Sequence, residues 1–95
     1  MTYNVYLHTN YSKKYEKLED KDPKVHNFIK TGLNKLKENP FEKENKKLTG
    51  DWKGYRRVKV DGYRIIYEIV HNKELGIDEV NVIKFGPRKN VYVKS

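Results

Sequence analysis

The stretch "GYRRVKVDGYRIIYEIV", residues 54–70, consists of two alternating segments separated by Asp61-Gly62. An Asp-Gly pair between alternating segments is a strong signal for a tight β-turn. We therefore predict two antiparallel strands, at residues 55–60 and 63–70. Because side chains alternate across a strand, one face of the second strand should be entirely apolar or aromatic and should pack on a core: Tyr63, Ile65, Tyr67 and Ile69.

The opposite face of the same two strands is basic. Arg57 and Lys59 alternate with core-facing valines, and Arg64 lies on the same side of the next strand. Like charges on adjacent strands repel one another, and Glu68 is the only acidic residue nearby in the pattern. A bound phosphate would neutralise these charges. The alternative is a solvated face whose charges prevent edge-to-edge pairing.

Further strands are predicted at residues 3–8 and 79–86. The last strand is ambiguous, because Val80, Val82, Ile83 and Phe85 are all apolar. If Ile83 and Phe85 face the core, Lys84 joins the basic side. The segment "HNKELGID" at residues 71–78 is predicted to be a loop, and the tail from residue 87 shows no helical pattern.

Residues 10–38 predict a helical hairpin with one apolar stripe. Asn10 or Ser12 could cap its first helix, and Asp22-Pro23 should start the second. Gly32, inside the second helix, suggests close packing. A sheet from the rest of the chain must cover the stripe. The expected fold is a single α+β domain over residues 1–95: a helical hairpin packed on an antiparallel sheet, in the order β-α-α-β-β-β.

The composition limits the possible functions. The net charge is +8, and the 21 cations include only four Arg, all in the second half of the chain. Guanidinium groups match phosphate oxygens better than ammonium groups do. The chain has no Cys and its three His are scattered, so we expect neither metal nor cofactor. It shows no signal peptide and no run of roughly 18 apolar residues, so we expect a cytoplasmic protein without membrane contact.

An Arg and Lys cluster suits phosphodiester chemistry. Cleavage of RNA by its own 2′-hydroxyl requires removal of a proton, stabilisation of a phosphorane and protonation of the leaving 5′-oxygen. Cations can provide the second of these. Tyr92, four residues after Arg88, could carry the proton. Equally, Tyr92 could be an aromatic residue that packs the tail onto the body.

Two segments, "LTGDWKGYRRVKVDGYRIIYEI" and "VNVIKFGPRKNVY", resemble the RelE/ParE superfamily of toxin–antitoxin toxins, and within it the RelE-type mRNA interferases. The shared pattern is a Leu-x-Gly segment, a basic strand, a Gly-Tyr-Arg return, a Gly-x-Arg and a terminal Val-Tyr. It covers about the last half of the chain, and the helical hairpin before it fits the β-α-α-β-β-β order of the family.

The resemblance implies a ribosome-dependent endoribonuclease that cuts mRNA and is inhibited by an acidic, RelB-like antitoxin. It places Arg57 and Lys59 near the scissile phosphate and makes Arg64 a phosphate stabiliser. Arg88 is expected to offset charge on the leaving oxygen or to protonate it. Tyr92 is expected to act as the base toward the 2′-hydroxyl. The partners would be the antitoxin, the ribosome and mRNA.

Two other functions stay open. A ParE-like toxin of the same fold would act on DNA gyrase without being a nuclease. A non-catalytic RNA-binding domain would bind RNA without cleaving it. Arg56 stands directly before Arg57, so the register of the basic strand is uncertain by one residue: either of the two could lie on the basic face. The combination of the basic cluster with a terminal Tyr favours the nuclease.

Overall fold

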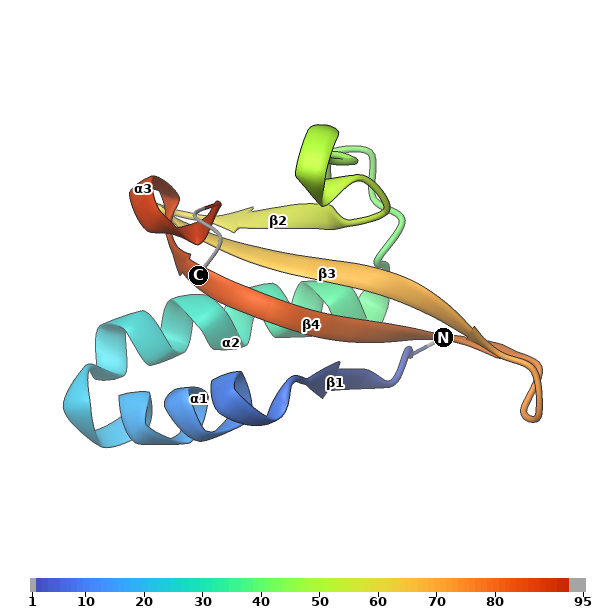
Figure 1. Ribbon diagram of the computed structural model, residues 1–95. Helices are drawn as coiled ribbons and strands as arrows, with labels where there is room; N and C mark the ends of the chain where they lie inside the picture. Colours follow the sequence, from blue (N-terminus) through green and yellow to red (C-terminus); the bar gives the residue numbers. More distant parts are fainter. Residues whose placement is uncertain (1, 93–95) are drawn as a thin grey trace.

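The computed structural model describes residues 2–92 and shows two helices packed on one face of a four-stranded sheet (Figure 1). The predicted α+β class and the order β-α-α-β-β-β are confirmed. The elements are β1 Val5–Leu7, α1 Thr9–Lys21, α2 Pro23–Glu38, the 3-10 turn η1 Gly50–Trp52, β2 Arg56–Val60, β3 Tyr63–Asn72, β4 Ile77–Pro87 and α3 Arg88–Val91.

The sheet has the strand order β1-β4-β3-β2. Strands β2, β3 and β4 form the predicted antiparallel meander. Strand β1, however, pairs with β4 in parallel, with Val5 opposite Val80 and Leu7 opposite Val82. The sheet is therefore mixed, and the prediction of a wholly antiparallel sheet is wrong at β1. Two hairpin reversals fix the direction of β4, and the helical hairpin between β1 and β2 sets the direction of β1 independently.

The two long helices meet at the predicted boundary. The carboxylate of Asp22 accepts a hydrogen bond from the backbone N–H of Val25 at 3.3 Å, and Pro23 is the first residue of α2. The prediction for the start of α1 is wrong. His8 is its N-cap, without a side-chain capping bond, and both Asn10 and Ser12 lie inside the helix.

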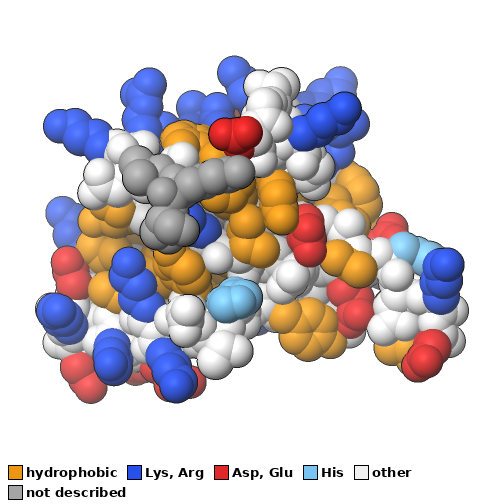
Figure 2. All heavy atoms as spheres, in the orientation of Figure 1, with side chains coloured by type: hydrophobic (Ala, Val, Ile, Leu, Met, Phe, Trp, Pro, Cys, Tyr) orange, Lys and Arg blue, Asp and Glu red, His pale blue; other side chains and the backbone are white. Residues whose placement is uncertain are grey.

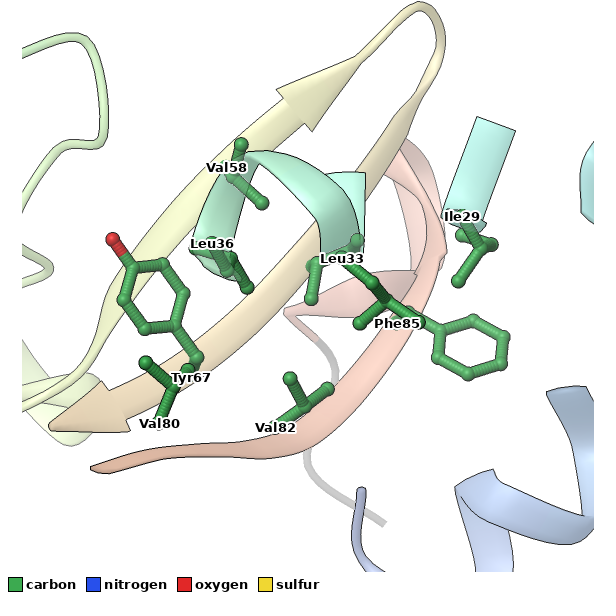
Figure 3. Close-up of a cluster of buried hydrophobic side chains, with 9 residues drawn as sticks. Ile29, Leu33, Leu36, Val58, Tyr67, Val80, Val82 and Phe85 are labelled. Carbon is green, nitrogen blue, oxygen red and sulfur yellow. The ribbon is translucent and has the colours of Figure 1, made fainter. Parts of the chain in front are cut away.

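The core lies between α2 and the sheet (Figure 3). It contains three residues of α2 and six residues of the meander: Ile29, Leu33, Leu36, Val58, Ile65, Tyr67, Val80, Val82 and Phe85. Gly32 lets the helix approach the sheet closely, as predicted. A Cβ at this position would lie 2.9 Å from Cγ2 of Val60 and even closer to Cδ1 of Ile65.

A β-bulge resolves the ambiguity of the last strand. Ile66 pairs with Lys84, but the next residue, Tyr67, pairs with Val82. Ile83 is therefore an extra residue on β4. The bulge allows Val82 and Phe85 to face the core together, while Ile83 is only half-buried and lies outside the core cluster. The sequence left open whether Ile83 and Phe85 both face the core. Of the two, Phe85 faces it and Ile83 does not, and Lys84 lies beside the basic strands.

Strands β3 and β4 extend beyond the helices as a hairpin arm, residues 70–79 (Figure 1). The predicted loop at residues 71–78 is therefore too long. The ladder continues to the pair Asn72–Ile77, because backbone hydrogen bonds between strands do not require that the side chains be buried. His71 and Asp78 face each other across the two strands, with Nδ1 and Oδ1 2.9 Å apart.

The chain after β4 also differs from the prediction, because residues 88–91 form the short helix α3. Its last residue, Val91, is 1% exposed. The short helix therefore buries one apolar side chain against the sheet. Residues 93–95 of the predicted tail lie outside the described residues. Between residues 2 and 92, no helix is both long and apolar enough to cross a membrane.

Candidate functional site

The strand register confirms that three predicted cations share one face of the sheet. Lys59 lies directly opposite Arg64, and Arg57 lies opposite Ile66, whose partner on β4 is Lys84. Residues opposite each other on antiparallel strands have Cβ atoms about 5 Å apart. The face therefore gathers positive charge from three neighbouring strands.

Arg56 lies on the other face, which settles the register of the basic strand. It pairs with Tyr67, a core residue. Its guanidinium carbon lies 5.7 Å from the ring centroid of Phe41, and its Nη1 atom donates to the carbonyl of Asn45 at 3.5 Å. Arg56 thus holds the loop before β2, and Arg57 is the residue on the basic face.

The basic face is partly covered, contrary to the expectation of an open sheet surface. Ile66 is wholly buried and Arg64 is only 8% exposed. Helix α3 and the turn η1 lie on the side of the sheet away from α1 and α2 (Figure 1). The sequence could not reveal this cover, because it comes from two segments far apart in the chain.

Arg64 is held inside the β2–β3 turn. Its Nη1 atom donates to the backbone carbonyls of Asp61, at 3.1 Å, and Tyr63, at 3.0 Å. Asp61 has the positive φ of +57° that the tight turn requires. The guanidinium therefore stabilises the turn as well as contributing charge, and its remaining N–H groups keep donor capacity.

The other two strand cations differ in burial. Arg57 is half-buried, and its Nη1 atom is buried without a hydrogen-bond partner among residues 2–92. Lys59 is exposed on the edge strand β2 and also borders a cleft of about 300 Å³ whose acidic lining residues are Glu38, Glu42 and Glu44. Lys59 therefore stands between the basic face and an acidic cleft at the sheet edge.

Helix α3 brings the two C-terminal candidates to the same end of the sheet. The backbone N–H of Arg88 donates to the carbonyl of Gly62 at 3.0 Å, which ties α3 to the β2–β3 turn. The Arg88 side chain is exposed and Tyr92, after the helix, is half-buried. We call the five cations of this region the basic end: Arg57, Lys59, Arg64, Lys84 and Arg88.

Trp52 is a neighbour of the site that sequence reasoning missed. Its indole N–H donates to the backbone carbonyl of Tyr92 at 3.3 Å, and Nζ of Lys84 lies 5.9 Å from its ring centroid. The first contact holds the backbone of Tyr92, the residue proposed as the proton carrier, against the turn η1. The available signal was the only Trp of the chain, set in the polar segment "GDWKG".

Tyr67 fastens the loop before β2 onto the sheet. Its hydroxyl donates to the carbonyl of Pro40 at 2.6 Å and accepts from Nδ2 of Asn45 at 3.0 Å. Burial raises the pKa of Tyr67, while the Asn45 hydrogen bond and the charge of Arg56 act in the opposite direction. Asn45 is itself only 6% exposed, and nothing in the sequence marked it as a buried polar residue.

The chemistry available at the basic end is binding of an anion. The four cations predicted from the sequence as site residues form no ion pair with a carboxylate within residues 2–92: Arg57, Lys59, Arg64 and Arg88. In the same part of the chain, no group of three or more His, Cys, Asp or Glu side chains is arranged to hold a metal ion. The exposed Lys59 and Arg88 can contact an external phosphate, whereas Arg64 and Nη1 of Arg57 are buried and add positive charge from beneath the surface.

Comparison with known proteins gives a consistent result. Residues 5–92 match the family model described as "ParE toxin of type II toxin-antitoxin system, parDE". The fold is similar to that of a YoeB/ParE toxin from Agrobacterium tumefaciens, with TM-score 0.70, 18% identity and coverage of 90% of this chain and 98% of the other.

It is also similar to YafQ from E. coli strain BL21(DE3), with TM-score 0.67, 22% identity and coverage of 96% of this chain and 99% of the other. At these identities the two structures establish the fold alone. No curated protein sequence matches the chain.

Proposed function

The chain belongs to the ParE toxin family of type II toxin–antitoxin systems, and from this premise we propose that it is a ribosome-dependent endoribonuclease that cleaves mRNA in the cytoplasm. The resemblance to the RelE/ParE superfamily is thereby confirmed. Membership also implies an antitoxin partner. We propose that this partner is acidic, because the toxin carries a net charge of +8.

One observation carries the proposal. Arg57, Lys59 and Arg64 share a face by strand register, and the backbone bond from Arg88 to Gly62 joins α3 to the turn between those strands. Both segments that resemble the family, residues 48–69 and 80–92, therefore contribute cations to the basic end. Preorganised cations stabilise the negative charge that develops on a phosphorane.

In the proposed reaction the 2′-oxygen of the RNA attacks the adjacent phosphorus, and the bond from phosphorus to the 5′-oxygen breaks. Tyr92 accepts the proton of the 2′-hydroxyl. Arg57, Lys59 and Arg64 offset the charge of the phosphorane. Arg88 either protonates the leaving 5′-oxygen or offsets its charge while water supplies the proton, so that a 2′,3′-cyclic phosphate and a 5′-hydroxyl are formed. Trp52 acts as a positioning residue, because it bonds to the carbonyl of Tyr92.

The test is mRNA cleavage in a bacterial translation extract. We expect the wild-type chain to cut translated mRNA, and Tyr92→Phe to lose cleavage. Arg64→Ala removes the bonds to two turn carbonyls, so the exposed Arg88→Ala is the cleaner probe of charge. Lys73→Ala, on the hairpin arm, is the control and should cleave normally. Equal cleavage by all these variants would remove the named side chains from the mechanism.

A second candidate function follows from the matched family model, whose description names parDE. A ParE-like toxin would act on DNA gyrase. Under this alternative the extract would show intact mRNA, and a supercoiling assay with purified gyrase would show inhibition that does not depend on Tyr92. A non-catalytic RNA-binding domain would show neither effect, and Arg64→Ala and Tyr92→Phe would weaken its RNA binding to a similar degree.

A further inference from the structure

A second basic surface lies on helix α1, outside the basic end. Four exposed lysines and two further residues around Leu18 line a hollow of about 550 Å³: Asn10, Lys13, Lys14, Lys17, Lys21 and Asp22. Figure 2 shows Lys and Arg side chains gathered at the lower left, over the helical part of the molecule. We call this hollow the α1 groove.

The charges of α1 are sorted between two sides of the helix. Its three acidic residues, Glu16, Glu19 and Asp20, do not line the groove. The one carboxylate that does, Asp22, already accepts the capping hydrogen bond from the N–H of Val25. A helix surface stabilised by its own charges would pair Glu and Lys at i, i+4, whereas here the lysines of the groove form no ion pair within residues 2–92.

The groove follows helix α1 and is lined by one apolar residue, Leu18. Lys14 lies over the rings of Tyr11 and Phe85, with Nζ 5.5 and 5.8 Å from the two centroids. From Lys14 to Lys21 the helix rises about 10 Å at 1.5 Å per residue. That length corresponds to about three nucleotides of a helical strand at 3.4 Å per step. A row of lysines at this spacing suits a chain of phosphates better than a single anion.

The α1 groove leads to the basic end. A smaller hollow shares Lys14, Leu18 and Asp22 with the groove and reaches Gly86 and Pro87 at the end of β4. The next residue along the chain is Arg88, a member of the basic end. The two basic surfaces are thus connected along the side of the molecule.

We propose that the α1 groove holds the sugar–phosphate backbone of an RNA strand that continues from the basic end. The placement of the strand relative to a cleavage site rests on the proposed function, but the groove's affinity for RNA does not. Lysine provides a point charge without the planar fork of arginine, so the groove should bind phosphates irrespective of sequence. Its connection to Arg88 favours RNA over an acidic protein segment.

The experiment measures binding of the full chain to a fluorescent 20-nucleotide RNA carrying 2′-O-methyl groups throughout, which the proposed 2′-oxygen attack cannot cleave. Fluorescence anisotropy gives the affinity at several salt concentrations from 50 to 200 mM. Each phosphate contact adds about 0.7 to the slope of log K against log salt for a single strand. The groove variant is the triple substitution Lys13→Gln, Lys17→Gln, Lys21→Gln.

We expect the groove variant to lower this slope by about 2 and to weaken binding on the order of 100-fold at 0.1 M salt. The matched control is Lys30→Gln, Lys35→Gln, Lys37→Gln, which removes the same charge from exposed positions of α2 and should change the slope much less. Thermal melting of both variants verifies that the fold is intact.

Three outcomes would overturn the proposal: equal slope changes in the two triple variants, no measurable RNA binding, or displacement of the RNA by polyglutamate at equal charge concentration. The translation extract separates this inference from the nuclease proposal. If the groove variant alone loses RNA binding while the wild-type chain cleaves no mRNA, the α1 groove stands and the proposed cleavage activity falls.

Discussion

The basic end and the hairpin arm occupy opposite ends of one sheet face, yet they handle charge in different ways. At the basic end, cations from three strands converge, and Arg57, Lys59 and Arg64 form no ion pair with a carboxylate within residues 2–92. At the arm, the carboxylate of Glu79 accepts hydrogen bonds from the Tyr6 hydroxyl at 2.9 Å, from Nδ2 of Asn72 at 3.0 Å and from Nδ2 of Asn4 at 3.4 Å.

The two ends also differ in what they expose. Of the five large hydrophobic side chains that are exposed within residues 2–92, four lie on the arm or on the neighbouring strand β1: Tyr6, Val70, Leu75 and Ile77. On the face shown in Figure 2, Lys and Arg side chains lie along the top and at the lower left, whereas hydrophobic and acidic side chains occur on both halves of the view.

The two ends therefore differ in how their charges are paired. A carboxylate with three neutral donors is already satisfied, and the Asn72 and Tyr6 hydrogen bonds lower the pKa of Glu79. The exposed Lys59 and Arg88 of the basic end form no ion pair with a carboxylate within residues 2–92, so both can donate to an external anion. Substitutions at the two ends should therefore affect different properties.

The largest expected effect is on activity. Arg88→Ala should reduce the rate of mRNA cleavage by a factor of about 10² to 10³, the usual cost of removing one preorganised donor from a transition state. Ile77→Ser, at the opposite end of the face, should leave the rate within about twofold. Single-turnover cleavage of ribosome-bound mRNA measures both. Comparable losses at the two ends would abolish the distinction drawn between them.

The next effect concerns Tyr67, which lies at the β-bulge between the two ends. Tyr67→Phe removes the donor to the carbonyl of Pro40 and the acceptor of the Asn45 amide. Because Asn45 is buried, we expect a loss of about 1–3 kcal/mol in the free energy of unfolding. Urea denaturation measures it. Tyr6→Phe, at an exposed hydroxyl, is the matched control and should cost much less.

Substitutions of Gly32, which packs on the sheet, and of Gly76, in the turn of the arm, should destabilise the fold for different reasons. Gly32→Ala places a methyl group against Ile65 and Val60, and such overpacking typically costs about 1–3 kcal/mol. Gly76, in the turn of the arm, has φ +65° and open space around its Cβ position. Gly76→Asn should cost a few tenths of a kcal/mol, because Asn tolerates the left-handed region. Thermal melting compares the two, and equal losses would contradict close packing at Gly32.

The smallest effect is the pH dependence of the arm. The pKa of Glu79 is lowered in the folded state, so its ionised form stabilises the fold above the ordinary value of 4.5. This contribution is lost as the pH falls through the folded-state pKa. The melting temperature of Glu79→Gln should therefore lie below that of the wild type at pH 7, and the two should converge only as the pH falls below the lowered folded-state pKa of Glu79. A constant difference across this range would exclude the ionised carboxylate as the cause.

Local patterns predicted much of the site. The alternation of residues 56–60 and 63–70 placed Arg57, Lys59 and Arg64 on one face, and Asp61-Gly62 and Asp22-Pro23 marked a turn and a helix start. Each of these depends on neighbours within a few residues, and strand periodicity or capping chemistry expresses them directly. The roles of these side chains in catalysis remain predictions until cleavage is measured.

Residue patterns along the chain were enough to predict the order of the elements, the two faces of the β2–β3 hairpin and the excess of positive charge. They did not predict that β1 lies parallel to β4, that a bulge removes Ile83 from the core, or that α3 and the turn at Trp52 cover part of the basic face. The two groups of features differ in the sequence separation of the residues that produce them. Side-chain alternation is a property of a single strand, whereas burial and pairing depend on segments brought together from distant parts of the chain.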